Sequence, residues 1–229
     1  MIAFKKRLAT GLRLGLSRAN AARLAKLDTP QTIQNFICSL PPNFEPDGDT
    51  CRSANEALNH NRIHCIEGAF VSACALAMNG DPPLLMDFQA KGDFDHIVAL
   101  YRRDGCWGAI SKSNHLWLRW RNPVYRSLRE LAMSYFHEYA GVRRGRKLHS
   151  LWAYSTPVDL GRFDTRRWVC GKTPCWDVAV ALDEARHYQL LTLSQAKRLR
   201  ASDPIEIKAN DLYEHRPPRK VRKNKENQA

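Results

Sequence analysis

The sequence predicts an α+β fold in which one buried helix packs on an antiparallel sheet. The first observation is a helical repeat in residues 65–78, where apolar side chains recur at positions 66, 69, 70, 73 and 77. The second is a hairpin signal, because apolar runs at residues 95–102 and 106–111 flank Arg103-Asp104-Gly105. A chain of 229 residues with 44% hydrophobic residues is long enough for one domain with its own core.

The net charge of +13 is concentrated at the two ends of the chain. Residues 1–27 carry seven Lys and Arg and no acidic residue, and residues 215–229 carry six against one glutamate. With Leu8, Leu12 and Leu16 among its basic residues, the first end is a basic amphipathic N-terminal segment. It suits an anionic membrane surface, an organellar transit peptide or a helix lying on the domain. We expect residues 211–229 to be a disordered basic tail, which leaves 28–210 as a nearly neutral folded domain.

The other elements follow from capping and breaking residues in chain order. Thr29 and Pro30 begin a helix that Pro41-Pro42 ends. A polar loop at 43–52 then leads into a short helix at 53–58. Gly80 closes the helix at 65–78. Beyond it we expect strands at 84–88, 116–121, 148–154 and 178–182, and helices at 124–139 and 194–200.

Cys65 falls in the first turn of the 65–78 helix. Free backbone N–H groups and the helix dipole favour a thiolate there, so the position suits a cysteine nucleophile. The alternative is a small apolar filler, since cysteine is among the most buried residue types. His60 and His64 flank Cys65, and we expect them to shape access to it rather than to perform chemistry.

His96 opens the strand that follows and is the candidate base. If Asp104-Gly105 is a two-residue turn, His96 lies opposite Ser113 and shares a face of the sheet with Ser111. A three-residue turn instead places Asn114 diagonal to His96. Either register offers a polar side chain that orients the imidazole, as a catalytic base requires. The alternative is a half-buried strand histidine that is bonded to backbone.

The order of these residues resembles the transglutaminase-like branch of the papain-like cysteine enzymes. A Cys at a helix start, Asp95-His96 opening a strand and the run Gly-Cys-Trp-Gly-Ala-Ile-Ser that ends at residue 111 carry the match. The resemblance covers roughly residues 50–120. It implies a papain-like, transglutaminase-like core within residues 28–210, with Cys65 as nucleophile and His96 as base. The run from Cys65 to Tyr139 also resembles an uncharacterised bacterial family of this superfamily.

One position departs from the pattern of the superfamily. The Trp that follows the His strand matches Trp107, but Ser111 stands where the triad Asp is expected. Ser113 and Asn114 are the neighbouring alternatives for the third group. Papain-like enzymes also use a glutamine upstream of the nucleophile to stabilise an oxyanion, and Gln34 matches it by chain order alone.

The resemblance implies acyl transfer or amide hydrolysis through a thioester, on a peptide or another amide-containing substrate. Backbone N–H groups at the start of the Cys65 helix would supply the oxyanion site. The identity of the substrate and of the acyl acceptor stays open. The alternative is a catalytically inactive transglutaminase-like binding module that uses its basic termini to bind an acidic partner or an anionic membrane surface.

No metal or cofactor is expected. The sequence lacks a Gly-rich phosphate loop, a dinucleotide fingerprint and a His-Glu-x-x-His motif. Cys170 and Cys175 lack the second pair of ligands that a zinc site needs. A metal held by Cys65, His96 and His115 is the remaining alternative. Seven cysteines at irregular spacing, without a secretory signal, suit free thiols in the cytoplasm.

Aromatic and basic residues alternate near Trp117, Trp120, Arg119 and Arg121, a pattern that also suits stacking on nucleic acid. Alternate Trp residues on a strand more often belong to the core, so we do not expect the core to bind nucleic acid. No stretch approaches the roughly 20 apolar residues of a membrane span.

Overall fold

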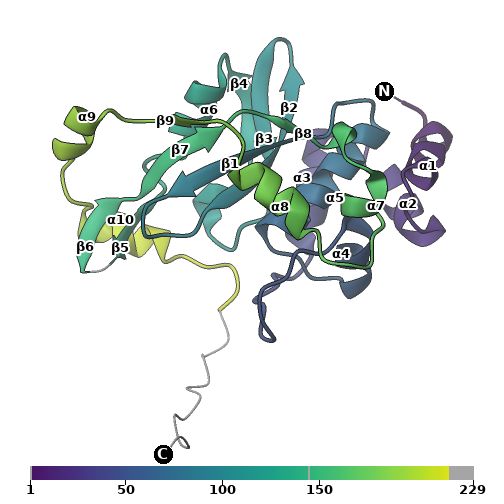
Figure 1. The fold of residues 1–229 in the computed structure, drawn as a ribbon, viewed down its shortest axis with the longest axis horizontal. Coiled ribbons are helices and arrows are strands. Elements are labelled where there is room, and N and C mark those ends of the chain that lie inside the picture. Colours follow the sequence, from purple (N-terminus) through teal and green to yellow (C-terminus); the bar gives the residue numbers. More distant parts are fainter. Residues whose placement is uncertain (1, 144, 217–229) are drawn as a thin grey trace, which may run out of the picture.

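The computed structural model describes residues 2–143 and 145–216, and within them the chain has the predicted α+β fold with an antiparallel sheet. The larger sheet has the strand order β4-β3-β2-β1-β7-β9, with β8 paired to β1 (Figure 1). A separate hairpin joins β5 (Ala140–Arg143) and β6 (Arg146–His149). The strands of the larger sheet are β1 (Leu84–Ala90), β2 (His96–Arg103), β3 (Cys106–Ile110), β4 (Arg121–Tyr125), β7 (Leu151–Ser155), β8 (Val158–Asp159) and β9 (His187–Gln189).

Most of the helices gather at one end of the sheet, on the right of Figure 1. These are α1 (Phe4–Arg13), α2 (Arg18–Ala25), α3 (Pro30–Ser39), α4 (Ala54–His60), α5 (Cys65–Met78) and α7 (Thr165–Trp168). The others are α6 (Leu128–Met133), α8 (Trp176–Asp183), α9 (Leu193–Lys197) and α10 (Pro204–Asn210).

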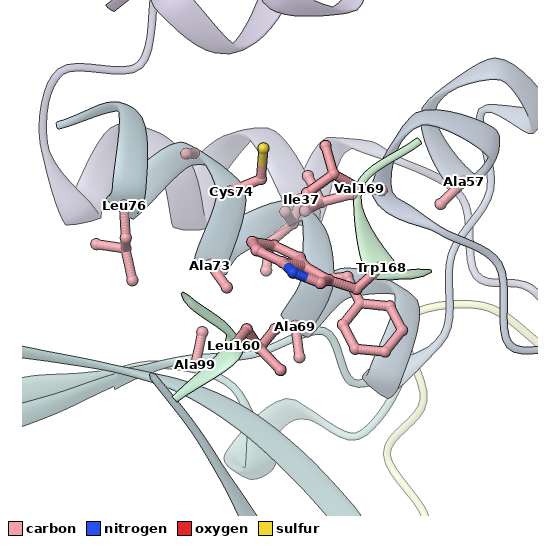
Figure 2. Packing of buried hydrophobic residues seen from close by; sticks show 14 of the residues in the cluster. Ile37, Ala57, Ala69, Ala73, Cys74, Leu76, Ala99, Leu160, Trp168 and Val169 are labelled. Carbon is pink, nitrogen blue, oxygen red and sulfur yellow. The ribbon is translucent and has the colours of Figure 1, made fainter. Parts of the chain in front are cut away.

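The helix that the others surround is α5, and its bounds confirm the helix predicted at 65–78. Twelve of its 14 residues are buried, because α1, α3 and α4 pack around it and β2 lies against it. Small side chains such as Ala69 and Ala73 leave room for the indole of Trp168 beside the helix, as Figure 2 shows. Burying a large side chain such as Phe70 stabilises the fold by about 1.5–3 kcal/mol. The start of α5 is thus held by a closely packed core.

Side chains along β2 alternate between two apolar clusters. Ile97, Ala99 and Tyr101 belong to the cluster under α5. Val98 and Leu100 belong to the cluster on the other face, which α6 and the turns after it cover. The strand is therefore buried on both faces, which explains its nearly continuous apolar sequence.

The hairpin between β2 and β3 has the predicted two-residue turn. Arg103 pairs with Cys106, and Asp104 and Gly105 both have positive φ, of 50° and 78°. Two successive residues with positive φ are the signature of the tight turn that matches the twist of the strands. Of the two registers considered, this one places Ser111 on the same face as His96.

Two predicted strands are wrong. Residues 178–182 lie inside α8, because Val178 and Leu182 are buried one helical turn apart while Val180 is 48% exposed. Residues 116–118 form a 3₁₀ turn, and β4 begins only at Arg121. The helix predicted at 124–139 is also shorter than expected, because Tyr125 pairs with Trp107 as part of β4.

The N-terminal segment 1–27 forms α1 and α2, and both helices pack against α5. Leu16 and Leu24 belong to the cluster under α5. Arg7 is buried, and its Nε donates to the Ala25 carbonyl at 2.8 Å. Lys5, Lys6, Arg13, Arg18 and Lys26 are exposed. In the part of the chain that the structure describes, no helix combines the length and apolar character needed to cross a bilayer.

Candidate active site

Cys65 is the first residue of α5. His64 precedes it with an extended backbone, and its N–H donates to the Glu67 carboxylate at 3.3 Å, so the loop ends and the helix begins at this point. Cys65 is partly exposed and lines a cavity of about 270 Å³ together with His64 and His96. The structure thus brings the predicted nucleophile and the predicted base into one cavity.

His96 is buried, and its Nε2 atom has two neighbours. Nε2 lies 3.0 Å from the Leu118 carbonyl and 3.1 Å from Ser111 Oγ. A carbonyl oxygen can only accept, so Nε2 must carry a proton. In the neutral ring Nδ1 is then the basic nitrogen, and His96 is close enough to the Cys65 thiol to lower its pKa.

His64 is held in the same way, by a backbone carbonyl at Nε2. Its Nε2 lies 2.9 Å from the Thr50 carbonyl and therefore also carries a proton. Nδ1 lies 4.0 Å from Cys65 Sγ. Nε2 is further 3.4 Å from a Glu45 oxygen and 3.6 Å from a Glu67 oxygen. Two imidazoles thus offer basic nitrogens to one sulfur, and His64 has carboxylates behind it.

Glu67 is the buried carboxylate of this network. Its side chain is 0% exposed and pairs with Arg52 Nη1 at 3.3 Å. Thr50 Oγ1 donates to it at 3.0 Å, and the Arg52 N–H donates at 3.2 Å. Asn43 Nδ2 adds a bond of 3.3 Å. A buried carboxylate with a guanidinium and several donors around it is compensated in its charged form, so it fixes the loop at 43–52 against the start of α5.

These contacts set the charges at the site. Burial alone would raise the pKa of the Cys65 thiol, but hydrogen bonds from His64 and His96, and the charges of both rings, outweigh it and lower the pKa to about 5. Burial alone would lower the pKa of His64. The hydrogen bond and charge of Cys65, together with the Glu67 and Glu45 carboxylates, instead raise that pKa to about 9. Between these two values the favoured form is a thiolate beside an imidazolium.

Ser111 is fixed by its own contacts as well as by His96. Its Oγ donates to the Leu118 carbonyl at 2.6 Å. Its backbone is held by Gln34, whose Nε2 donates to the Ser111 carbonyl and whose Oε1 accepts from the Ser111 N–H, both at 3.0 Å. Gln34 therefore uses both ends of its amide on the Ser111 backbone, whereas chain order suggested an oxyanion role.

Ser113 and Asn114 have other partners. Ser113 Oγ accepts from the His115 N–H at 3.0 Å. The amide of Asn114 makes two bonds with the backbone of His215, both at 2.9 Å. Of the three predicted orienting groups, Ser111 contacts His96, whereas Ser113 and Asn114 line the same cavity and bond to other residues.

The chain after α10 lies along the loop at 113–119. Arg119 Nη2 is 2.6 Å from the Glu214 carboxylate, and His115 forms a β-bridge with Tyr213. Asn210, the last residue of α10, lines the cavity. Residues of the segment 211–216, the first part of the predicted tail, thus contact the loop at 113–119. The remainder of the predicted tail, 217–229, lies outside the described residues.

Helix α5 and the chain after β3 approach each other closely beside the site. A Cβ on Gly68 would lie 2.6 Å from the Cβ of Lys112. Lys112 is buried, and its Nζ donates to the Leu40 and Cys38 carbonyls at 2.5 and 3.3 Å. The ammonium group is therefore committed to the end of α3, and Gly68 allows the contact that places Ser111 near the start of α5.

Cys51 and Cys175 anchor the other end of the loop at 43–52. Both are buried, the Cys175 N–H donates to the Cys51 carbonyl at 2.7 Å, and the two thiols are hydrogen-bonded. Cys175 is the cap of α8. The backbone that carries Thr50 is therefore attached to α8.

Neither metal alternative gains support from the geometry. Among the described residues, no three His, Cys, Asp or Glu side chains are grouped as metal ligands would be. His115 Nδ1 lies 2.8 Å from the Asn210 carbonyl and is occupied there. The grouping of Cys65 with two imidazoles is an arrangement for proton transfer.

The position of His64 differs from the sequence-based prediction. His64 was expected to shape access, whereas its ring contacts the sulfur. The sequence did contain one signal for it. Glu67 follows His64 by three residues, which is typical of a helix start and places a carboxylate next to His64. No sequence pattern indicated that Thr50 and Glu45 would contact His64.

A scan against protein-family models and a search of curated proteins each find no match to this chain.

Proposed function

We propose that this protein is a cysteine-dependent acyl transferase or amide hydrolase of papain-like, transglutaminase-like type. The observation that carries the proposal is the position of Cys65 at the start of α5, beside the ring of His64 and on the wall of a cavity of about 270 Å³ that His96 also lines. A thiolate at a helix start beside an imidazolium is the usual form of an activated cysteine nucleophile.

The two imidazoles have different roles in the proposed reaction. His64 is the cation that holds the thiolate, because the Cys65 sulfur and, to a smaller extent, the Glu67 and Glu45 carboxylates raise the pKa of its ring to about 9. His96 is the group that takes the proton of the incoming water or amine, because Ser111 and Leu118 hold its Nε2–H and leave Nδ1 free to accept. Position 111 lacks a carboxylate, and the carboxylates of the site lie beside His64 instead.

The reaction runs in two halves. The thiolate of Cys65 attacks the acyl carbon, a C–S bond forms, and the carbonyl electron pair moves to oxygen. That pair returns to expel the leaving amine, which takes from the His64 imidazolium the proton that the thiol gave up. In the second half, water or an acceptor amine attacks the thioester and gives its proton to the His96 ring. The C–S bond then breaks and the thiolate is restored.

Backbone N–H groups of the first turn of α5 would face the developing oxyanion, since the first N–H groups of a helix have no partner within it. The substrate class is a peptide or another compound with an amide bond. All seven cysteines are free thiols, which supports a location in a reducing compartment such as the cytoplasm.

Selective alkylation tests this proposal. At pH 6 about 0.9 of a thiol with a pKa of 5 is thiolate, against about 0.003 for a pKa of 8.5. The weaker nucleophilicity of the more acidic thiolate offsets part of this advantage. We therefore expect iodoacetamide to label Cys65 about 10 times faster than an unperturbed thiol. The rate should rise as the pH is raised through about 5, because deprotonation creates the nucleophile.

Peptide mapping by mass spectrometry gives the labelling rate of each cysteine. Cys65→Ala is the background control, and Cys74 is an internal one, because burial raises its pKa to about 12. Equal labelling rates for Cys65 and a small free thiol at pH 6 would rule the proposal out.

A further inference from the structure

Tyr139 carries a hydroxyl that the fold does not use. The residue follows the turns after α6, is 4% exposed and lines the same cavity as Cys65. Its hydroxyl oxygen is buried and has no hydrogen-bond partner within the described part of the chain. A buried hydroxyl without a partner costs free energy, so it calls for an explanation other than stability.

Two other buried tyrosines show what the fold does elsewhere. The Tyr101 hydroxyl donates to the Arg121 carbonyl at 3.1 Å, and the Tyr135 hydroxyl donates to the Arg119 carbonyl at 3.2 Å. Neither lines the cavity that holds Cys65. Of these three tyrosine hydroxyls, the one without a partner belongs to the residue that lines the cavity with Cys65.

We propose that the Tyr139 hydroxyl donates a hydrogen bond to the acyl oxygen of the substrate while that oxygen becomes negative. This inference rests on the proposed function and adds a side-chain donor to the backbone N–H groups of α5. A preformed donor in a buried site stabilises a developing oxyanion more than it stabilises a neutral carbonyl. Tyr139 would thus lower the barrier to acylation and deacylation alike.

The surroundings keep the donor protonated. Burial raises the pKa of Tyr139 well above its usual range, and the nearby negative charges of Cys65, Asp93 and Asp95 raise it further. The hydroxyl is therefore available as a donor at every pH at which the Cys65 thiolate is present and the protein is folded. No proton has to leave Tyr139 during the reaction.

The test compares two reactions of the same sulfur. Iodoacetamide alkylates the thiolate by displacing iodide, and no oxyanion forms. p-Nitrophenyl acetate acylates it through a tetrahedral oxyanion and releases p-nitrophenolate. In Tyr139→Phe we expect the acylation rate of Cys65, followed by phenolate release and by mass spectrometry of the acyl-enzyme, to fall about 10- to 100-fold. The alkylation rate should stay within about twofold.

Tyr101→Phe is the matched control, because it removes a buried hydroxyl outside the cavity. It should lower the melting temperature without changing the ratio of acylation to alkylation. Tyr139→Phe should melt no lower than the wild type, since it removes an unpaired polar group.

The outcomes separate this inference from the proposed function. If Cys65 of the wild type neither alkylates nor acylates faster than a free thiol, the proposed function fails and the inference fails with it. If Cys65 reacts fast in both assays and Tyr139→Phe acylates at the wild-type rate, only the role of Tyr139 is overturned. An equal loss in both rates would assign the hydroxyl to the thiolate instead, which also contradicts the inference.

Discussion

The Cys65 sulfur shares one cavity with the imidazoles of His64 and His96, and the Nε2 atom of each ring is hydrogen-bonded to a backbone carbonyl. His64 is fixed by Thr50 and His96 by Leu118, so each ring can accept a proton only at Nδ1. Cys65 has one proton to give, and the carboxylates beside His64 favour that ring as its acceptor.

His64→Asn tests this division of roles. Removing the ring takes away the largest influence that lowers the pKa of Cys65. We expect the midpoint of the alkylation profile to move up from about 5 by at least about one unit, because a lost charge partner shifts a pKa by 1–3 units.

His96→Ala should also raise this midpoint, since the His96 ring is hydrogen-bonded to the same thiol. It differs in abolishing the hydrolysis of the acyl-enzyme, which His64→Asn should only slow. A His64→Asn variant with the wild-type profile would show that the cation at the site is not His64.

Cys65, His96 and Ser111 could be predicted as site residues from the sequence, because a helical repeat and a two-residue turn define their positions. His64 and Tyr139 could not. Their roles depend on the path of the loop at 43–52 and of the turns after α6, which have no periodic pattern to predict them. The register also allowed Ser113 and Asn114, which line the cavity, but their side chains bond to the backbone of His115 and His215.

Among the elements, the contact between α5 and the chain after β3 sets the geometry of the site. Gly68→Ala should lower the free energy of unfolding by about 1–3 kcal/mol, because the added Cβ would lie 2.6 Å from Lys112 Cβ and one element must shift. Urea unfolding measures the loss, and the Cys65 alkylation rate should fall with it.

Gly141→Ala is the matched control for this substitution, because a Cβ there has no heavy atom within 4 Å and the backbone φ is not positive. Equal stability of the two variants would contradict the idea that the close approach at Gly68 is needed.

Elements with a single clear period were predictable, and those with competing patterns were not. The 65–78 helix and the β2–β3 hairpin have unambiguous stops in Gly80 and Asp104-Gly105. The run at 178–182 is rich in β-branched residues but packs only every fourth residue, so local composition favoured a strand while tertiary packing selected a helix. The alternation at 116–120 was read as a strand, although the Leu118 carbonyl is needed by His96.

For the molecule as a whole, the N-terminal segment belongs to the core that supports the site. Residues 1–27 were predicted to be a separate basic amphipathic segment, because they carry an excess of positive charge that residues 28–210 lack. That charge is real, but Arg7 is not part of an exposed surface, since its Nε donates to the Ala25 carbonyl at 2.8 Å and its guanidinium also bonds the Ile2 carbonyl.

A pair of substitutions measures this difference. Arg7→Gln should lower the free energy of unfolding by about 1.5–3 kcal/mol, because it breaks hydrogen bonds of a buried charged group. Lys6→Gln should change it by less than about 0.5 kcal/mol, because Lys6 is exposed. Equal effects would mean that α1 contributes nothing specific to the fold.

The bond between Cys175 and the backbone of Cys51 has a consequence for how this protein can be shortened or rearranged. Cys65, His64 and His96 all lie within residues 64–96. The loop at 43–52, which contacts His64, is nevertheless hydrogen-bonded to the start of α8, more than a hundred positions later. A minimal fragment that kept these three residues but not α8 would lose the bond between Cys175 and Cys51, and with it the low pKa of the Cys65 thiol.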